Sequence, residues 1–221
     1  MPYIGYWQLL AMVDVFVLYD NIQYTKKGWV NRNRFLRDGK DVLFTIPLKK
    51  GSDFLDVRER FVAEEFDRNK LLNQLKAAYQ KAPFFGTVFP VVTACVNAEQ
   101  QNLFDFIHHS IRLTASLLQI KTPITVSSSL GIDHTKRGQD KVIALCKALG
   151  AKTYINPIGG LDLYSKPAFA EQGVDLQFVK TKAISYQQHA EPFVPNLSII
   201  DVMMFNSLES IRSLLCEYDV I

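Results

Sequence analysis

The second half of the chain alternates between strand-like and helix-like segments, and this rhythm constrains the fold more than any other feature. The strand-like segments are TPITVSSSL, AKTYINPIGG and VDLQFVK. The helix-like segment QDKVIALCKALG separates the first two, and a shorter helix is expected over 166–172. Strands joined by helices pair in parallel through right-handed crossovers. We therefore expect an α/β fold with a three-layer, mainly parallel, doubly wound (Rossmann-like) sheet.

The first half predicts an antiparallel hairpin excursion near the N-terminus. A short helix that starts near Ile4 leads into an apolar strand over 13–19. Residues 29–46 then alternate around an Asp38-Gly39 turn, which is typical of a β-hairpin, and DVRERFV reads as a further strand. Helices are expected over 63–81, 87–98 and 102–120, and as two short segments on either side of Asn206-Ser207.

Length and composition predict one domain over 1–221. The 221 residues are 48% hydrophobic, which is enough for one substantial core, and no linker or repeat interrupts them. The formal net charge is only +3, and no basic stripe continues into the second half, so we expect no extended nucleic-acid partner. No run of 18 apolar residues and no signal peptide occurs, so we expect a cytoplasmic protein without membrane insertion.

Metal and cofactor motifs give no positive signal. Cys95, Cys146 and Cys216 stand far apart and form no CxxC pair, and no HExxH-like or carboxylate-rich pattern is present. We therefore expect no metal held by protein ligands alone, and the sequence indicates no particular cofactor. A GxSxG nucleophile elbow is also missing. An enzyme with this sequence is expected to position two substrates rather than to form a covalent intermediate.

Polar residues follow each predicted parallel strand, where ligands bind in doubly wound sheets. They are Asp20 and Gln23 after VDVFVLY, Ser127 and Ser128 after PITV, and Asn156, Gly159 and Gly160 after KTYI. Adjacent glycines let the backbone approach a ligand closely, although Gly-Gly pairs are also ordinary turn formers. The segment SSSLGIDHTKRGQDK adds Lys136 in front of a helix N-terminus, which suits a phosphate; ordinary N-capping by Thr135 is the alternative.

The stretch YDNIQYTKKGWVNRNRF combines cations, amides and aromatic rings. Arg32 and Arg34 share one face of the predicted strand, and Asn31 and Asn33 share the other. Burying either pair is costly without partners, which favours contact with a ligand over a plain polar hairpin. Trp29 is expected either to stack on a base or sugar ring or to pack in the core. Lys49 adds positive charge to the same hairpin.

His189 is the histidine that we expect to act as a general base. It lies in SYQQHAEPFVPNLSIID, a polar segment between the last predicted strand and the closing helices. From there a base is expected to reach the carboxyl edge of the sheet.

Six separated motifs resemble the WbqC-like protein family, in the same order and across nearly the whole chain. They are PYIGYWQLLAMVDVFVLYDNIQYTKKGWVNRNRF, FTIPLKK, AYQKAPFF, SSSLGI with the helix after it, CKALGAKTYINPIGGLDLY and PNLSIIDVMMFN. The resemblance implies a cytoplasmic bacterial protein whose relatives are often encoded with surface-polysaccharide or O-antigen genes. Some relatives are associated with attaching an acyl or aminoacyl group, such as glycine, to amino sugars. Relatives also carry a short strand before the PYIGY-like segment, so the first family strand is expected ahead of Met1.

The expected function is therefore that of a transferase of surface-polysaccharide or nucleotide-sugar metabolism, with a phosphorylated small molecule or nucleotide sugar as its partner. Asp20 or His189 is expected to handle the proton. The expected substrate-binding residues are Gln23, Trp29, Asn31, Arg32, Asn33, Arg34, Lys49, Ser127, Ser128, Lys136, Asn156, Gly159, Gly160 and Asn196. A nucleotidyltransferase-like enzyme and a non-catalytic small-molecule-binding component of a polysaccharide gene cluster are the alternatives.

Overall fold

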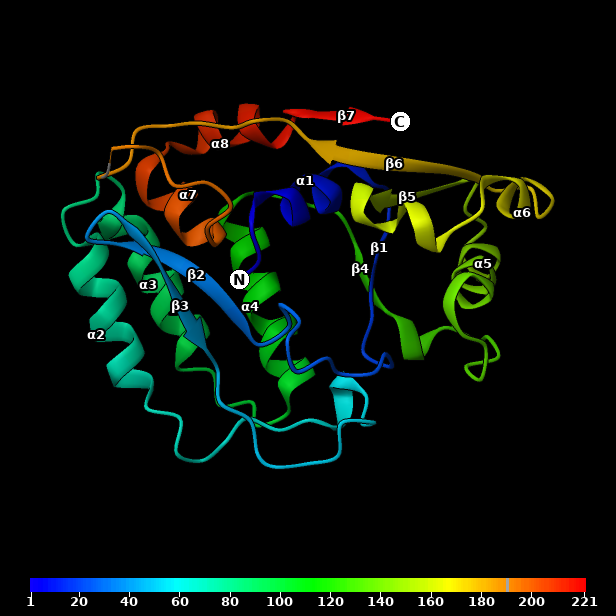
Figure 1. The fold of residues 1–221 in the computed structure, drawn as a ribbon, viewed down its shortest axis with the longest axis horizontal. Coiled ribbons are helices and arrows are strands. Elements are labelled where there is room, and N and C mark those ends of the chain that lie inside the picture. The colour runs from blue at the N-terminus through cyan, green and yellow to red at the C-terminus, as the bar shows by residue number, and fades with distance from the viewer. Residues whose placement is uncertain (190) are drawn as a thin grey trace.

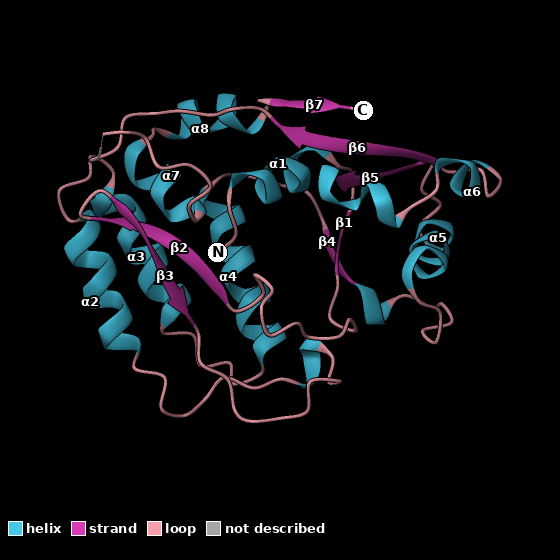
Figure 2. Cartoon of the chain, viewed as in Figure 1, coloured by secondary structure: helices cyan, strands magenta, loops and turns pink. Residues whose placement is uncertain are grey.

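The computed structural model describes residues 1–189 and 191–221, and it has a mixed α/β fold (Figures 1 and 2). The helices are α1 (Ile4–Met12), α2 (Arg68–Tyr79), α3 (Phe85–Val96), α4 (Leu103–Leu117), α5 (Gly138–Ala148), α6 (Lys166–Ala170), α7 (Ile199–Phe205) and α8 (Leu208–Leu215). The strands are β1 (Phe16–Leu18), β2 (Arg32–Arg37), β3 (Lys40–Thr45), β4 (Ile124–Val126), β5 (Thr153–Pro157), β6 (Asp175–Thr181) and β7 (Tyr218–Val220). The predicted helices are all present with shifted ends.

The strands form three small sheets instead of the single doubly wound sheet that the sequence predicts. β1 pairs with β4 in parallel, and β5 pairs with β6 in parallel while β7 runs antiparallel to β6. The parallel pairing is thus confirmed, but the three-layer sheet is not, because no strand among the described residues joins β1 to β5. The strand expected ahead of Met1 stays a prediction.

The hairpin β2–β3 confirms the predicted antiparallel excursion. Arg37 pairs with Lys40, so Asp38 and Gly39 form a two-residue turn. Their φ angles are +51° and +75°. Two left-handed residues in succession make a type I′ turn, whose twist matches that of the flanking strands, and Asp-Gly favours it.

Two segments differ from the prediction. DVRERFV forms a 3₁₀ turn over Val57–Glu59 rather than a strand, because Asp56 and Glu59 make a reciprocal capping box that starts a helical turn. Only isolated bridges at Asp56, Phe61 and Val62 remain of the predicted pairing. β7 was not predicted, since its three residues carry no clear alternation.

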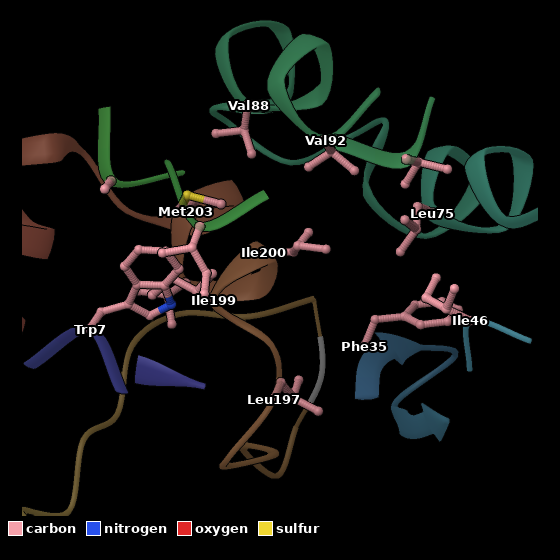
Figure 3. Packing of buried hydrophobic residues seen from close by; sticks show 14 of the residues in the cluster. Trp7, Phe35, Ile46, Leu75, Val88, Val92, Leu197, Ile199, Ile200 and Met203 are labelled. Carbon is pink, nitrogen blue, oxygen red and sulfur yellow. The ribbon is translucent and has the colours of Figure 1, made fainter. Parts of the chain in front are cut away.

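The main core lies where α1, α2, α3, α7 and β2 meet. Figure 3 shows Trp7 of α1 beside Ile199 and Met203 of α7, with Phe35 of β2 opposite Leu75 of α2. A second, smaller cluster lies under β5 and β6 and contains Val142, Cys146, Phe169, Val174, Leu176 and Phe178. The junction between these two clusters contains the carboxyl end of β1.

A buried carboxylate ties the connection between β6 and α7 to the main core. Asp201 has no exposed surface and accepts hydrogen bonds from Tyr79 Oη at 2.9 Å, Tyr186 Oη at 2.7 Å and Gln188 Nε2 at 2.7 Å. Burial raises the pKa of Asp201, although the three hydrogen bonds act in the opposite direction. The loop residues Tyr186 and Gln188 are therefore fixed by one acid group.

Candidate functional site

The carboxyl ends of β1 and β4 bring Asp20 and Ser127 together, as their positions after two parallel strands predict. Asp20 Oδ1 accepts hydrogen bonds from Ser127 Oγ at 2.8 Å and from the Ser128 backbone N–H at 3.0 Å. The Asp20 N–H donates in turn to Ser127 Oγ at 3.3 Å. Both Asp20 and Ser127 are buried. Because Phe16, Val17 and Leu18 pair in register with Ile124, Thr125 and Val126, the two strands end at the same level.

This environment keeps Asp20 ionised. Burial alone would raise its pKa, but hydrogen bonds from Ser128 and Ser127 outweigh burial and hold the pKa below its usual value. Arg58 lies beside the second carboxylate oxygen, with Nη1 4.0 Å from Oδ2. Because that guanidinium is half exposed, it adds a cation at the edge of the site rather than a strong buried ion pair.

Asn21 extends the site to helix α5. Lys141 Nζ donates to the Asn21 carbonyl oxygen at 2.8 Å and to Asn21 Oδ1 at 2.9 Å. The Ser127 hydroxyl also lies 2.7 Å from Asn21 Oδ1, so its single proton serves either Asp20 or Asn21 at one time. Burial, and then the nearby Arg137, lowers the pKa of Lys141.

His134 closes the network on the far side of Asn21. Its Nε2 lies 3.0 Å from the Leu130 carbonyl oxygen, which can only accept, so Nε2 carries a proton. Its Nδ1 lies 3.0 Å from Asn21 Nδ2 and accepts from that amide. The ring orientation therefore fixes the Asn21 amide, which leaves Asn21 Oδ1 facing Lys141.

Replacing Lys141 by Met tests how much this network contributes to stability. Lys141→Met leaves the buried Asn21 carbonyl without its donor, so we expect the free energy of unfolding to fall by about 1–3 kcal/mol in urea denaturation. Lys147→Met on the same helix is the matched control, because Lys147 is exposed and, among the described residues, hydrogen-bonds only to the exposed Gln172. Equal losses in the two variants would contradict a special role for Lys141.

The amides of Asn31 and Asn33 are used inside the protein. Asn31 accepts from Tyr24 Oη at 2.9 Å and donates to the Ile46 carbonyl at 2.8 Å. Asn33 donates to the Met1 carbonyl at 2.8 Å and accepts from the Arg34 N–H. Both side chains are buried, and their hydrogen bonds within the protein offset the free energy of removing the amides from water. A ligand contact by these amides stays a prediction.

Arg32 and Arg34 both lie close to Trp29, which is 58% exposed. Each guanidinium carbon lies 5.3 Å from the centre of the Trp29 ring. Arg32 also donates from Nε to the Gly28 carbonyl at 2.9 Å and from Nη2 to the Lys27 carbonyl. Arg34 pairs with Asp41 at 2.9 Å. An exposed ring with two cations beside it can bind a flat or anionic group.

The remaining predicted binding residues are spread over the molecule. Gln23 donates to the Asp53 carbonyl, Lys49 pairs with Glu64, and Lys136 is exposed before α5. The N-cap of α5 is Arg137 without a side-chain cap bond, so Thr135 does not cap this helix. Gly160 lies against Asn156, which leaves no room for a Cβ atom, whereas Gly159 is open. Asn196 has a φ of +58°, a conformation that asparagine tolerates well.

His189 lies apart from Asp20. Its ring packs edge-on against Phe205, with the ring centres 4.7 Å apart, and it lines a cavity of about 290 Å³ together with the β2–β3 turn. Neither Asp20 nor any of its hydrogen-bond partners borders that cavity. The structure thus does not bring the two predicted proton-handling residues together.

Sequence reasoning missed three residues of the network, namely Asn21, Arg58 and Lys141. Lys141 carried a usable signal: it falls on the same face of α5 as Val142, Leu145 and Cys146, which are all buried. A lysine on an apolar helix face needs a buried partner. Arg58 carries no such signal, because the sequence pattern of its segment predicts a strand.

Among residues 1–189 and 191–221, no helix is long and apolar enough to cross a membrane. Over the same residues, no group of three or more His, Cys, Asp or Glu side chains is placed to hold a metal ion.

Helices and parallel strands make the chain an α/β protein, and a polar cluster lies at the carboxyl ends of β1 and β4. It belongs to the WbqC-like protein family, whose family model matches residues 1–213. A relative in Mycobacterium tuberculosis (strain ATCC 25618 / H37Rv), the uncharacterized protein Rv1507c, is 25% identical over 209 residues, which span 93% of this chain and 89% of that protein. No solved structure matches the chain.

Proposed function

We propose that the chain is an enzyme of bacterial surface-polysaccharide or nucleotide-sugar metabolism that transfers an acyl or aminoacyl group to the amine of a nucleotide-linked amino sugar. The observation that carries this proposal is the buried, ionised carboxylate of Asp20 at the end of β1. Its Oδ1 is held by two donors, and its Oδ2 lies 4.0 Å from Arg58 Nη1. A fixed anion beside a half-exposed guanidinium suits the amine or hydroxyl of a sugar.

In this proposal Asp20 orients the acceptor amine and does not remove its proton. A carboxylate whose pKa is held low is a weak base near neutral pH. Arg58, Arg32 and Lys136 supply positive charge for the phosphate groups, and Trp29 supplies a stacking face for the base or the sugar.

Lys141 is the base that we assign to the transfer, in place of His189. The reaction forms a carbon–nitrogen bond as the amine attacks the acyl carbonyl carbon, and the amine then loses a proton while the acyl group leaves its donor. A neutral lysine amine keeps two N–H groups, which are enough for both bonds to Asn21, and its lone pair is free to take that proton. The lowered pKa of Lys141 makes this neutral form more accessible than in an exposed lysine.

A ligand screen tests the proposal directly. We expect nucleotide-linked amino sugars to raise the melting temperature of the purified chain, because a ligand at 100 times its Kd adds about 2.7 kcal/mol of stability. Nucleotides without the sugar, and sugars without an amine, are expected to give smaller shifts.

Two variants distinguish binding at this site from binding elsewhere. Arg58→Gln is expected to reduce the stabilisation, whereas His189→Gln is expected to keep it, since His189 lies at a separate cavity. Stabilisation that persists in Arg58→Gln and disappears in His189→Gln would move the site to the other end of the molecule. Binding without any acyl transfer to the amine would favour a non-catalytic binding component.

A further inference from the structure

A large apolar cavity lies between β1 and the helices α2, α3 and α4. Its volume is about 530 Å³, within the range of roughly 300–1,000 Å³ found for pockets that hold ligands. Leu75, Val92 and Leu103 line its deep end and are fully buried, and Figure 3 shows the first two on their separate helices. Four successive residues, Phe16 to Tyr19, form a wall that is about 10 Å long at about 3.3 Å per strand residue.

Exposed residues mark the mouth of this cavity. Ile22 and Trp29 both line it, and each is more than half exposed. Tyr19 also lines the cavity, so Asp20 lies in the short segment between two lining residues. On the other side of the network, Lys141 Nζ lies 5.5 Å from the centre of the Tyr19 ring. The cavity therefore opens beside the candidate site.

The walls of the cavity suit an aliphatic chain. The polar side chains of Asn31 and Asn33 bond within the protein, and Ser110 Oγ donates to the Ile107 carbonyl at 2.8 Å. Among the described residues, no carboxylate lines the cavity. A protonated amine would have no acid partner inside it, and burying an unpaired charge is costly. The cavity is therefore unsuited to a glycyl or other aminoacyl group.

Arg32 gives the mouth a positive charge. Of the described residues that line the cavity, it alone has a charged side chain, and it lies beside the exposed indole ring. Arg34 pairs with Asp41, whereas no carboxylate among the described residues pairs with Arg32. Two of its N–H groups donate to the carbonyls of Gly28 and Lys27. A guanidinium has five N–H donors, so others can bind an anion.

We propose that the cavity binds the straight aliphatic chain of an anionic amphiphile, whose anionic group is held by Arg32 at the mouth. In the transfer proposed above, this ligand is the acyl donor, an aliphatic acyl chain on a carrier that bears a phosphate. The amine nitrogen bonds the acyl carbon, and the bond from that carbon to the carrier breaks. The carrier leaves with the electron pair while Lys141 takes the amine proton. The role as donor rests on the proposed function, whereas the binding of the chain does not.

Isothermal titration with hexyl, octyl and decyl phosphate tests the cavity without any amino sugar. We expect each added pair of methylene groups to strengthen binding about 15-fold, which is about 0.8 kcal/mol per buried methylene. Decyltrimethylammonium has the same chain with the opposite charge, and it is expected to bind at least about tenfold more weakly than decyl phosphate. Affinity that does not depend on chain length, or equal binding of the cation, would overturn the proposal.

A matched pair of variants in α3 locates the chain. Val92→Met adds volume at the deep end of the cavity, whereas Val88→Met makes the same change at a buried position of the same helix outside the cavity. We expect Val92→Met to lower the ratio of decyl to hexyl affinity at least about tenfold and Val88→Met to keep it. The ratio compares two ligands on one folded protein, so a general loss of stability does not change it. An unchanged ratio in Val92→Met would place the chain elsewhere and overturn the proposal.

Arg32→Gln tests the anionic end of the ligand. We expect it to weaken binding of all three alkyl phosphates by the same factor, about tenfold, because the chain still fills the cavity. Arg37→Gln is the control on the same strand, since Arg37 lies near Asp38 and does not line the cavity. Equal affinities in the wild type and Arg32→Gln would overturn the assignment of the anionic group. Alkyl phosphate binding without stabilisation by any nucleotide-linked amino sugar would support the cavity assignment and contradict the proposed function.

Discussion

Asp201→Ala is expected to lower the free energy of unfolding by about 3 kcal/mol at pH 5. The carboxylate accepts from Tyr79, Tyr186 and Gln188 in a fully buried position, and each donor that loses its acceptor there costs about 1–3 kcal/mol. Urea denaturation followed by tryptophan fluorescence measures the loss. Asp162→Ala is the matched control, because Asp162 is exposed and makes no side-chain hydrogen bond or ion pair with the residues that the structure describes. It is expected to change stability by less than about 0.5 kcal/mol.

The same variant has a definite pH dependence. Burial raises the pKa of Asp201 in the folded protein above its usual value. A carboxyl group of this kind contributes stability that is fully present below its unfolded pKa, about 3.9, and that is lost as the pH rises through the folded pKa. The difference in stability between the wild type and Asp201→Ala is therefore expected to be smaller at pH 8 than at pH 5. A difference that grows with pH would mean that the three donors outweigh burial.

Local signals in the sequence were enough to predict most elements of the fold. The buried face of α4, which includes Phe104, Ile111 and Ala115, repeats at helical spacing. The Asp38-Gly39 turn requires two left-handed residues, which few other pairs supply cheaply. Such features depend on neighbours within a few positions, so they can be read from one sequence.

The pairing of the strands could not be read in the same way. Whether β1 lies beside β4 alone or also beside another strand depends on contacts more than 100 positions apart, such as Phe16 with Ile124. The alternation of strands and helices favours one continuous sheet, but it does not indicate which strand edges pair with a neighbouring strand. The direction of the parallel pairs is therefore confirmed, whereas the extent of the predicted sheet is not.

The candidate site was predictable only in part. Asp20 and Ser127 follow parallel strands, and this position alone brings them together. Asn31 and Asn33 donate to the backbone carbonyls of Ile46 and Met1. Every residue has a backbone carbonyl, so the identity of a residue does not indicate that it is the partner. A buried amide satisfied by a distant carbonyl therefore has the same sequence pattern as an amide that awaits a ligand.

Asp20→Asn is expected to weaken binding of a nucleotide-linked amino sugar by about 100-fold while leaving the fold intact. The asparagine oxygen can still accept from Ser127 Oγ and the Ser128 N–H, so the loss of stability is expected to stay within about 1 kcal/mol. The negative charge that meets the substrate amine is gone, and removing one partner of a desolvated charge pair costs about 2–5 kcal/mol of binding.

Isothermal titration of both proteins with the ligand that stabilises the wild type measures this change. Ser129→Ala is the control at the same strand end, because its hydroxyl is exposed and donates only to the Val126 carbonyl at 2.7 Å. We expect it to bind as the wild type does. If Asp20→Asn bound within about threefold of the wild type, a gap under 1 kcal/mol, the charge of Asp20 would serve the local fold and not the substrate. The low pKa of that carboxylate would then reflect only its bonds to Ser127 and Ser128.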